Sequence, residues 1–306
     1  MQSVFAEIEK NFVHGQPGEA KRLFHGRGQC FFGFEHLCID YYPPAVHCIW
    51  YEEPEKRTVD DLVEGLKQTL GQTLECLVFQ YRSDKKREPE IVFGKLPRQH
   101  QALEDGLLYH IDLGQRQNIG FFLDMRQGRH LVRSRAEGKR VLNLFAYTCS
   151  FSVTALTGGA SAVLNMDMNR SVLALGQRNH QLNSLDPRQA VFLDHDIFRS
   201  FGKLTRLGPY DLVIIDPPTF QRGSFQIKRD YPKLLRRLKG LLATDAEIIA
   251  TMNSPVLERD FLDKLFSELL PEAKLLGAYG PPTEGFAECG QQERGVKILH
   301  YGVKKN

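Results

Sequence analysis

The chain has 306 residues, of which 42% are hydrophobic and 25% charged, and its formal net charge is +3 at pH 7. This composition is ordinary for a soluble globular protein, and the length predicts one large domain beside a smaller one. No apolar run approaches the roughly 20 residues of a membrane span, and the N-terminus lacks the pattern of a signal peptide. We therefore expect a cytoplasmic protein without a membrane partner. The mild basicity is compatible with a nucleic-acid partner.

Six cysteines are scattered along the chain with no CxxC pair: Cys30, Cys38, Cys48, Cys76, Cys149 and Cys289. In a chain of this length and apolar content we expect them to be reduced thiols. Their spacing does not fit a structural zinc site, so no metal is expected.

Residues 1–100 are expected to form a small α+β module that would bind RNA or the substrate. An amphipathic stretch at Val4–Phe12 comes first. Aromatic and β-branched residues then predict strands, and apolar residues at helical spacing predict a helix with Thr58 as its N-cap. The strands are expected within Cys30–Tyr42, Val46–Tyr51, Leu74–Tyr81 and Glu90–Phe93, and the helix over Thr58–Leu70.

Residues 101–306 are expected to form the larger domain, which begins with a linking segment over Gln101–Arg126. Short apolar runs then alternate with helical patterns, which predicts a doubly wound α/β domain with a mostly parallel sheet. The strands are expected at Val141–Phe145, Ala162–Met166, Ala190–Leu193, Leu212–Ile215 and Glu247–Thr251. The helices are expected at Arg170–Leu182, Ile197–Thr205, Tyr231–Leu242 and Glu258–Leu269. Ligands of such sheets bind beyond the carboxyl ends of the strands.

Acidic residues follow three of these strands. Asp167, after the second strand, is placed to accept both hydroxyl hydrogens of a ribose, as in nucleoside-binding sheets of this topology. Asp196, after the third, is a candidate acceptor for an adenine amino group, with Ile197 or Phe198 beside the ring. Taken alone, each is equally well explained as a helix cap. The turn after the first strand lacks GxGxxG, which disfavours a nicotinamide enzyme.

The segment Asp216-Pro217-Pro218-Thr219-Phe220, after the fourth strand, is the most specific motif. Its two prolines remove two backbone donors and fix φ, so the turn is rigid and its carbonyls stay available to a ligand. The motif presents Asp216 as a polar acceptor and Phe220 as a stacking face. A plain turn needs neither, so we favour a functional interpretation.

Four segments together closely resemble the bacterial 23S ribosomal RNA large-subunit methyltransferases: GFFLDMRQGR, NLFAYTCSFSV, DMNRS and IIDPPTF. The nearest likeness is to the guanine-N7 methyltransferase domain, which carries DPPTF, whereas a branch that methylates cytosine carbon-5 carries DPPKF. The resemblance covers the chain from about Gln101 and, more weakly, the module before it. It implies a class I, Rossmann-like methyltransferase with a seven-stranded sheet, S-adenosylmethionine (SAM) as cofactor, and RNA, ribosomal in this family, as partner.

The resemblance also implies the residues of the site. For the acceptor base, our own hypothesis is that Phe220 stacks on its ring, while Asp216 and Asn253 orient its edge. Cys149 stands where those enzymes have glycine, and a left-handed backbone there would be costly for cysteine. The implied cofactor-binding residues are Phe121, Leu123, Asp124, Arg126, Asn143, Phe145, Tyr147, Thr148, Ser150, Phe151, Asp167, Met168, Asp196 and Asp216.

The positions of the cysteines bear on the reaction. Methylation of a pyrimidine carbon needs a covalent thiolate, and the carbon-5 branch has a cysteine near the position of Ser254. This chain has none there and none in the DPPTF loop. Guanine nitrogen-7 already has a lone pair and needs only in-line placement against the methyl group. We therefore expect transfer to a ring nitrogen.

Basic clusters are candidate contacts for the phosphates of single-stranded RNA. Two other interpretations stay open: a methyltransferase for a small molecule or protein, and a non-catalytic RNA-binding protein that has lost cofactor affinity. The oligomeric state also stays open. The clusters are Lys228, Arg229, Lys233, Arg236, Arg237 and Lys239; Arg126, Arg129, Arg133, Arg135, Lys139 and Arg140; and Lys85, Lys86 and Arg87.

Overall fold

The computed structural model describes residues 1–13, 18–84, 86–115, 117–218, 220–221, 225–289 and 294–304, without the side chains of 220 and 221. The chain forms two compact units. The first comprises Met1–Leu123 and Pro282–Gln291, and the second Asp124–Pro281 and Gln292–Asn306. The division thus falls after Leu123, whereas the sequence pattern placed it at residue 101, and the first unit also takes a segment from late in the chain.

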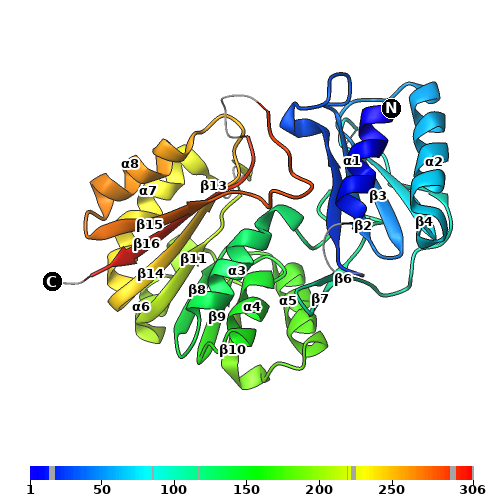
Figure 1. Cartoon of the computed structure of the whole chain (residues 1–306). Coiled ribbons are helices and arrows are strands. Elements are labelled where there is room, and N and C mark those ends of the chain that lie inside the picture. Colours follow the sequence, from blue (N-terminus) through cyan, green and yellow to red (C-terminus); the bar gives the residue numbers. More distant parts are fainter. Residues whose placement is uncertain are drawn as a thin grey trace. The chain divides into compact units, whose positions relative to one another are not determined.

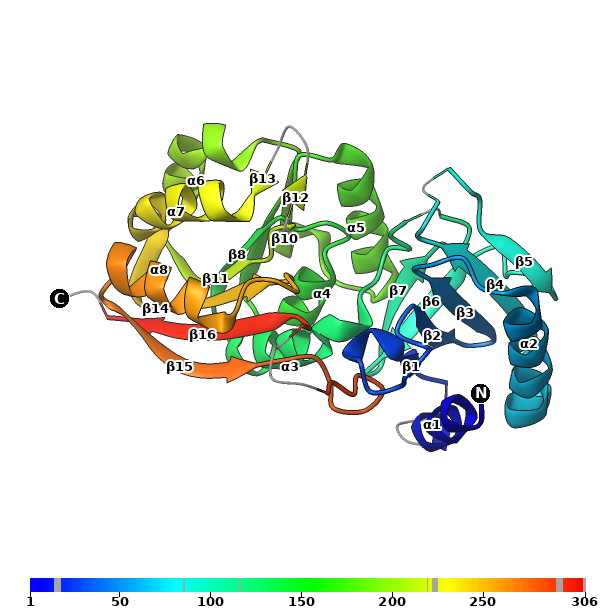
Figure 2. The ribbon, with the colours of Figure 1, turned by 90° about the horizontal axis from the view of Figure 1, so that it is seen from above.

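The first unit is built on a five-stranded sheet with the order β1-β2-β3-β4-β5, in which only β3 and β4 are parallel. Two helices, α1 and α2, contribute Val4, Leu62 and Leu66 to the core on one face of this sheet (Figure 2). A separate hairpin of β6 and β7 follows. The elements are α1 (Gln2–Val13), β1 (Lys21–His25), β2 (Leu37–Tyr42), β3 (Ala45–Trp50), α2 (Lys56–Leu70), β4 (Cys76–Tyr81), β5 (Glu90–Phe93), β6 (His100–Glu104) and β7 (Leu107–Ile111).

Two details of this unit differ from the sequence prediction. Helix α2 begins at Lys56, ahead of the predicted start at Thr58, so Thr58 lies inside the helix. The N-cap residue is Glu55, whose side chain makes no capping hydrogen bond. Cys30 is not in a strand, because β2 begins only at Leu37. Instead Cys30 forms a disulfide with Cys289, so the expectation of six reduced thiols was wrong for this pair. The two residues are 259 positions apart, beyond the reach of any local pattern.

The second unit contains the expected doubly wound sheet, with seven strands in the order β10-β9-β8-β11-β14-β16-β15. The first five are parallel to one another, and β16 runs antiparallel to both of its neighbours. This confirms the α/β fold class and the mostly parallel sheet. The strands are β8 (Arg140–Leu144), β9 (Ala162–Met166), β10 (Ala190–Leu193), β11 (Tyr210–Ile215), β14 (Leu242–Met252), β15 (Ala273–Tyr279) and β16 (Lys297–Val303).

Helices cover both faces of this sheet (Figure 1). On one face α3 and α4 pack against Val141, Val163 and Ile214. On the other face α6, α7 and α8 pack against Leu142, Leu164 and Ile215. This division follows from the alternation of side chains along each strand. The helices are α3 (Arg126–Arg135), α4 (Ser150–Thr157), α5 (Arg170–Leu182), α6 (Phe201–Leu207), α7 (Ile227–Leu238) and α8 (Arg259–Leu269).

Two helices of this unit have other bounds than predicted. Helix α7 begins at Ile227 instead of Tyr231, because the buried Asp230 accepts the backbone N–H of Gln226 at 2.9 Å and organises an extra turn ahead of Pro232. The segment expected as one helix from Ile197 is a 3-10 turn at Ile197–Arg199 followed by α6. A hairpin of two short antiparallel strands, β12 (Phe220–Gln221) and β13 (Phe225–Gln226), precedes α7.

Strand order reverses between β8 and β11, the neighbours at the centre of the sheet. From β8 the chain moves outward through β9 to β10, and then returns to β11 and continues to β14 on the other side. Ligands of open α/β sheets bind at the carboxyl edge beside this point. The same edge carries the residues after β8, β9, β10 and β11, so the fold brings the sequence-predicted positions together.

Candidate functional site

Backbone hydrogen bonds tie the four strand ends to one another at the carboxyl edge. The Ala146 N–H donates to the Met166 carbonyl at 3.0 Å, and the Asp167 N–H donates to the Leu193 carbonyl at 3.2 Å. The Asp216 N–H faces the Leu144 carbonyl at 3.4 Å. The loop after β8 therefore lies between Asp167 on one side and Asp216 on the other.

The loop of residues 145–149 has an unusual backbone. Phe145, Tyr147 and Cys149 have φ angles of 59°, 46° and 62°, in the left-handed region that favours glycine. Each such residue costs on the order of 1 kcal/mol, and backbone strain of this kind concentrates at ligand sites. Cys149 thus adopts the conformation that the sequence comparison marked as costly for it.

Asp167 lies directly against this loop. Its Oδ2 accepts the Tyr147 N–H at 3.0 Å, and its Oδ1 accepts the N–H of Asn169 at 2.9 Å. A carboxylate has about four acceptor positions, so each oxygen retains capacity for a ligand hydroxyl. The capping role at the start of α5 belongs to Asn169, which accepts from Ser171 and Val172.

Asp196 caps the turn that follows β10, with its Oδ1 accepting the Phe198 N–H at 2.8 Å. The capping interpretation therefore holds for Asp196, and a second role toward adenine stays a prediction. Phe198 and Phe145 both pack on the buried ring of Phe225, with ring centroids 6.4 and 5.0 Å apart. Through Phe225, the segments that follow β8 and β10 meet.

Asp216 is half-buried and surrounded by three polar side chains. The Thr251 hydroxyl donates to its Oδ1, while Asp124 and Arg129 interact with it electrostatically. Burial is the largest influence, and with the nearby Asp124 it raises the pKa of Asp216 to about 6, against the opposing effects of Thr251 and Arg129. Thr251 was not among the residues predicted for the site. No local pattern marks it, because the parallel register of Ile215 with Ala250, which places the next residue of each strand side by side, exists only in the folded sheet.

The upstream residues divide between the two units. Phe121 is buried in the first unit and stacks on Tyr109, with ring centroids 4.6 Å apart, and Leu123 ends the first of the two chain segments that make up that unit. Asp124 faces Asp216 within the second unit, and Arg126 opens α3. The structure therefore brings Asp124 close to Asp216, and a contact of the four residues with a cofactor stays a prediction.

Three further predicted residues point into the protein interior. The Asn143 side chain donates to Asn165 Oδ1 at 2.9 Å within the sheet. Phe151 belongs to the core between α3 and α4, and Thr148 is buried. Ser150 is the first residue of α4. A contact of these residues with a ligand would have to use the backbone of the loop instead of the side chains that are buried.

The residues predicted to contact the methylated base, and Met168 of the cofactor set, lie beside the strand ends or outside the described part of the chain. Asn253 is exposed just after β14, and Met168 is 52% exposed after β9. The Phe220 side chain and Thr219 lie outside the described part of the chain, as does Lys85 in the predicted basic tip. Next to Asn253, the Ser254 carbonyl accepts from the buried Lys297 Nζ at 2.6 Å.

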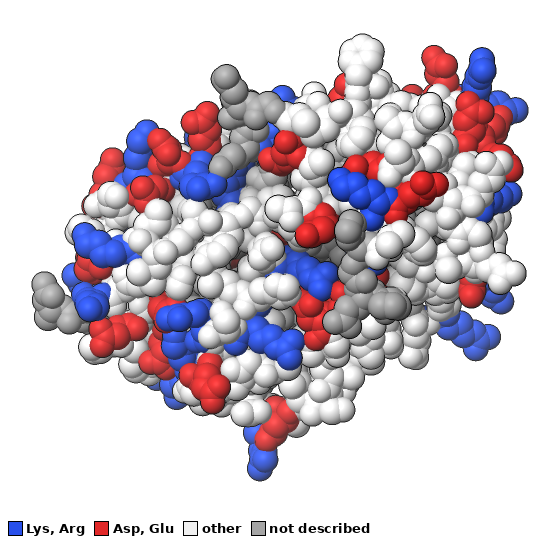
Figure 3. Space-filling model, viewed as in Figure 1, with Lys and Arg blue, Asp and Glu red and all other residues white. Residues whose placement is uncertain are grey.

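Many of the predicted basic contacts already have partners. Arg229 and Lys233 form ion pairs with Asp230, and Lys239 pairs with Glu272. Arg135 and Lys139 both bind Glu247, Arg129 is buried, and the Arg237 guanidinium lies over the Phe201 ring. Figure 3 accordingly shows basic and acidic side chains interspersed over the face of the second unit that it draws. Lys228 and Arg236 remain as exposed cations of α7.

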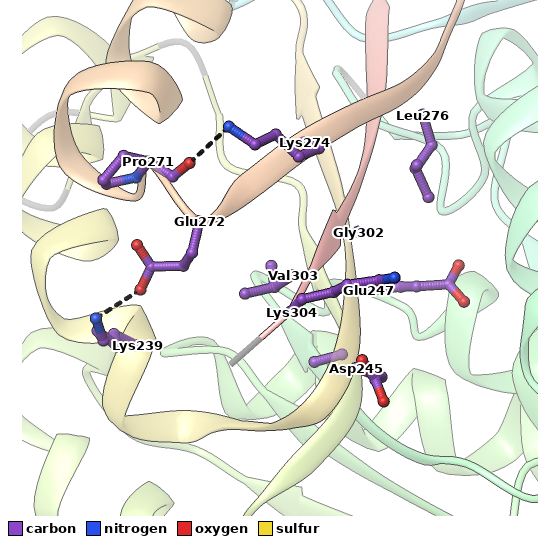
Figure 4. Close-up of a pocket in the computed structure, with 11 residues that line it drawn as sticks. Lys239, Asp245, Glu247, Pro271, Glu272, Lys274, Leu276, Gly302, Val303 and Lys304 are labelled. Atoms are coloured by element: carbon purple, nitrogen blue, oxygen red, sulfur yellow. Dashed lines mark hydrogen bonds and ion pairs between the residues drawn. The ribbon is translucent and has the colours of Figure 1, made fainter. Parts of the chain in front are cut away.

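A hollow of about 890 Å³ lies at the opposite edge of the sheet, where β14 begins and β16 ends (Figure 4). Its charged side chains are partly paired with one another, as in Lys239–Glu272 at 2.8 Å. It is lined by Lys239 of one predicted basic cluster but by none of the predicted catalytic or cofactor-binding residues. Within the described ranges, no group of three or more His, Cys, Asp or Glu side chains is placed to bind a metal ion. No helix there combines the length and apolar character of a membrane span.

Comparison with known proteins agrees with this geometry. The model of the S-adenosylmethionine-dependent methyltransferase family matches residues 21–288. Ribosomal RNA large subunit methyltransferase I of Aeromonas hydrophila is 30% identical over 255 residues, which are 79% of this chain and 63% of that protein. Ribosomal RNA large subunit methyltransferase K/L of a Shewanella species is 33% identical over 253 residues, 79% of this chain and 34% of that protein. A candidate methyltransferase crystallised with SAH has a TM-score of 0.88 at 29% identity, covering 98% of this chain and 80% of that one.

Proposed function

Because this chain belongs to the S-adenosylmethionine-dependent methyltransferase family, we propose that it transfers the methyl group of SAM to guanine nitrogen-7 in ribosomal RNA. The chain spans 63% of the first relative named above and 34% of the second, so their whole activity is not carried over by likeness alone. The proposal rests on the chemistry of the strand ends.

The residues at the carboxyl edge fit an adenosyl ligand. Asp167 retains acceptor capacity for ribose hydroxyls beside a strained loop, and Asp196 is half-buried one strand further along. Asp124 and Asp216 supply negative charge beside the loop's other flank, which suits the positively charged sulfonium of SAM. When bound, SAM supplies an electrophilic methyl group, and the protein holds it in line with the acceptor atom.

The state of the cysteines is the observation that favours a ring nitrogen as acceptor. All six lie in the described part of the chain, with Cys30 and Cys289 in a disulfide and the other four buried. Cys149 is the one nearest to the site, and burial raises the pKa of its thiol well above the usual range. A thiolate nucleophile of the kind that carbon methylation requires is therefore missing.

Asp216 is the residue that we assign to the acceptor. A carboxylate at the end of β11, set before the rigid Pro217-Pro218 turn, accepts hydrogen bonds from the N–H groups on the guanine edge. Methylation at nitrogen-7 leaves the base positively charged, so the negative charge of Asp216 stabilises the product-like transition state. Nitrogen-7 carries no proton, and no general base is needed.

The test is a methyl-transfer assay with the purified chain, SAM with an isotopically labelled methyl group, and ribosomal RNA from a strain that lacks this protein. We expect labelled 7-methylguanosine in the nucleoside mass spectrum. Label on a pyrimidine carbon, or transfer only to protein or small molecules, would contradict the proposal. Because ribosomal RNA is the substrate, we place the enzyme in the cytoplasm.

A further inference from the structure

One face of α5 packs directly beneath the strained 145–149 loop. The residues of this face are buried and are spaced by three, three and one positions, which puts them on one side of a helix. We call them the α5 platform: Leu173, Gly176, Asn179 and His180.

The platform holds the loop by three kinds of contact. Leu173 forms a small apolar cluster with Ala146 and Cys149. Asn179 Nδ2 donates to the Thr148 carbonyl at 2.9 Å. A Cβ added at Gly176 would lie 2.5 Å from Cys149 Sγ, so a glycine on the helix makes room for the cysteine of the loop.

His180 ends a buried chain of hydrogen bonds whose direction can be deduced. Its Nδ1 lies 2.7 Å from the Gly176 carbonyl, which can only accept, so Nδ1 carries the proton. Burial lowers the pKa of His180, so the ring is neutral and Nε2 is an acceptor. The Ser152 hydroxyl therefore donates to Nε2 at 2.8 Å.

The series of hydrogen bonds continues from Ser152 to the two strands that border the loop, β8 and β9. Ser152 Oγ accepts from Asn165 Nδ2 at 3.0 Å, and Asn165 Oδ1 accepts from Asn143 Nδ2 at 2.9 Å. Every donor thus points toward His180. These hydrogen bonds join β8, β9, α4 and α5. The 145–149 loop connects β8 to α4, and the segment with Asp167 connects β9 to α5.

Something must hold three left-handed residues in place, since such a loop relaxes when its surroundings allow it. We infer that the α5 platform holds the 145–149 loop in the form that binds SAM, and that His180 is a positioning residue for the methyl donor. This inference rests on the proposed function because it takes the loop as the donor site. It concerns the affinity for SAM, not the identity of the methylated atom.

The first test compares the dissociation constant of SAM for the wild type and two His180 variants by titration calorimetry. His180→Phe keeps a ring against Phe192, whose centroid lies 5.1 Å away, but removes the acceptor of the Ser152 hydroxyl and the second donor to the Gly176 carbonyl. We expect SAM to bind about tenfold more weakly, with kcat at saturating SAM changed by less than about twofold. His180→Gln restores an acceptor for Ser152 and should recover part of the affinity. Gln177→Ala, on the exposed side of α5, is the matched control.

The second test uses the fit between Gly176 and Cys149. Gly176→Ala places a methyl group against Cys149 Sγ and displaces the loop, so SAM binding should weaken about tenfold. Adding Cys149→Gly removes the two cysteine atoms that the methyl group would meet. We expect the double variant to bind SAM within about threefold of the wild type.

The thermal midpoint of each variant separates positioning from stability. If His180→Phe and Gly176→Ala lower the midpoint yet bind SAM as the wild type does, the platform serves only the fold and the inference is overturned. The same holds if Cys149→Gly fails to rescue Gly176→Ala while the double variant is folded. Failure of the proposed function would appear elsewhere, as a methyl group on another atom in the nucleoside mass spectrum.

Discussion

Asp216 combines burial with a functional position at the end of β11. Its carboxyl group is half-buried and close to Asp124, and its pKa is raised from 3.8 to about 6. Near neutral pH most molecules therefore carry the carboxylate, which is the form that accepts hydrogen bonds from guanine. Protonation converts one oxygen into a donor and removes the charge.

We predict that kcat/KM for RNA falls as the pH drops through about 6, because the active carboxylate is lost there. Asp216→Asn should abolish this acidic limb and lower kcat/KM by about 100-fold at pH 7.5, the cost of one lost hydrogen bond to a charged group. The measurement is the pH profile of methyl transfer between pH 5 and 8.

Thr251→Val supplies the matched control for that profile. It removes the hydroxyl that lowers the pKa of Asp216, so the acidic limb should move to higher pH with the plateau rate largely kept. If the fall in kcat/KM near pH 6 is unchanged in Asp216→Asn and in Thr251→Val, the titrating group is not Asp216.

At the scale of elements, β14 carries polar side chains with separate roles at its two ends. Thr251 at the carboxyl end contacts Asp216, whereas Glu247 near the amino end binds Arg135, Lys139 and His300 at 2.6 to 2.8 Å. Burial opposes ionisation of Glu247, but these hydrogen bonds outweigh it and lower its pKa to about 2. The cluster joins α3 and the segment after it to β14 and β16 of the sheet.

We predict that Glu247→Gln destabilises the protein by about 2 kcal/mol at neutral pH, because the buried His300 and the partly exposed Arg135 and Lys139 lose a charged acceptor. The pKa of Glu247 is lowered from 4.5, so its contribution is complete above about pH 4.5 and is lost as the pH falls toward 2. Urea unfolding at pH 7 and pH 3 measures this, and the difference between variant and wild type should be smaller at pH 3.

Asp245→Asn is the control for these unfolding measurements, since Asp245 lies exposed on the same strand as Glu247. Its unfolding free energy should follow the wild type at both pH values. An equal loss in this variant would show that the effect does not come from the Glu247 cluster.

The segment 282–289 is an element that belongs to the first unit although it lies between strands of the second. The Cys289 N–H donates to the Gly28 carbonyl at 2.7 Å, and the Arg22 guanidinium lies over the Phe286 ring at 4.5 Å. With the Cys30–Cys289 disulfide these contacts attach it to β1 and the turn that follows. The first unit is therefore complete only when both parts of the chain are present.

For the molecule as a whole, the net charge of +3 says little about where RNA binds. Ion pairs with Asp230, Glu247 and Glu272 neutralise much of the predicted basic surface. Lys228 and Arg236 on α7 stay exposed, and α7 directly follows the β12–β13 hairpin after the Asp216 turn. We propose the exposed side of α7, from Lys228 in its first turn to Arg236 in its last, as a contact for the RNA backbone.

We predict that Lys228→Ala with Arg236→Ala weakens binding of single-stranded ribosomal RNA and lowers the salt slope of log K by about 1.4, or about 0.7 for each lost phosphate contact. Lys264→Ala with Lys274→Ala removes the same charge from other exposed positions of the second unit. Binding measured at several salt concentrations compares the two pairs. Equal losses in both would contradict a specific role for α7.

Much of the second unit was predictable from local pattern. Short apolar runs alternating with helical periods predicted β8 to β14, because a parallel strand buried on both faces must be apolar along its length. Parallel strands then place their carboxyl ends at one edge, so Asp167, Asp196 and Asp216 had to gather there. The family was recognisable because NLFAYT and DPPTF are contiguous segments.

Other features depend on residues that meet only in the folded chain. The Cys30–Cys289 disulfide, the Thr251 hydrogen bond to Asp216, and the hydrogen bonds of the donor chain that ends at His180 join positions between 13 and 259 residues apart. Local periodicity carries no information about such pairs, since strand order and helix placement determine which side chains face each other. For the same reason, the pattern of charges located the basic residues, whereas folding determined which of them are neutralised by acidic partners.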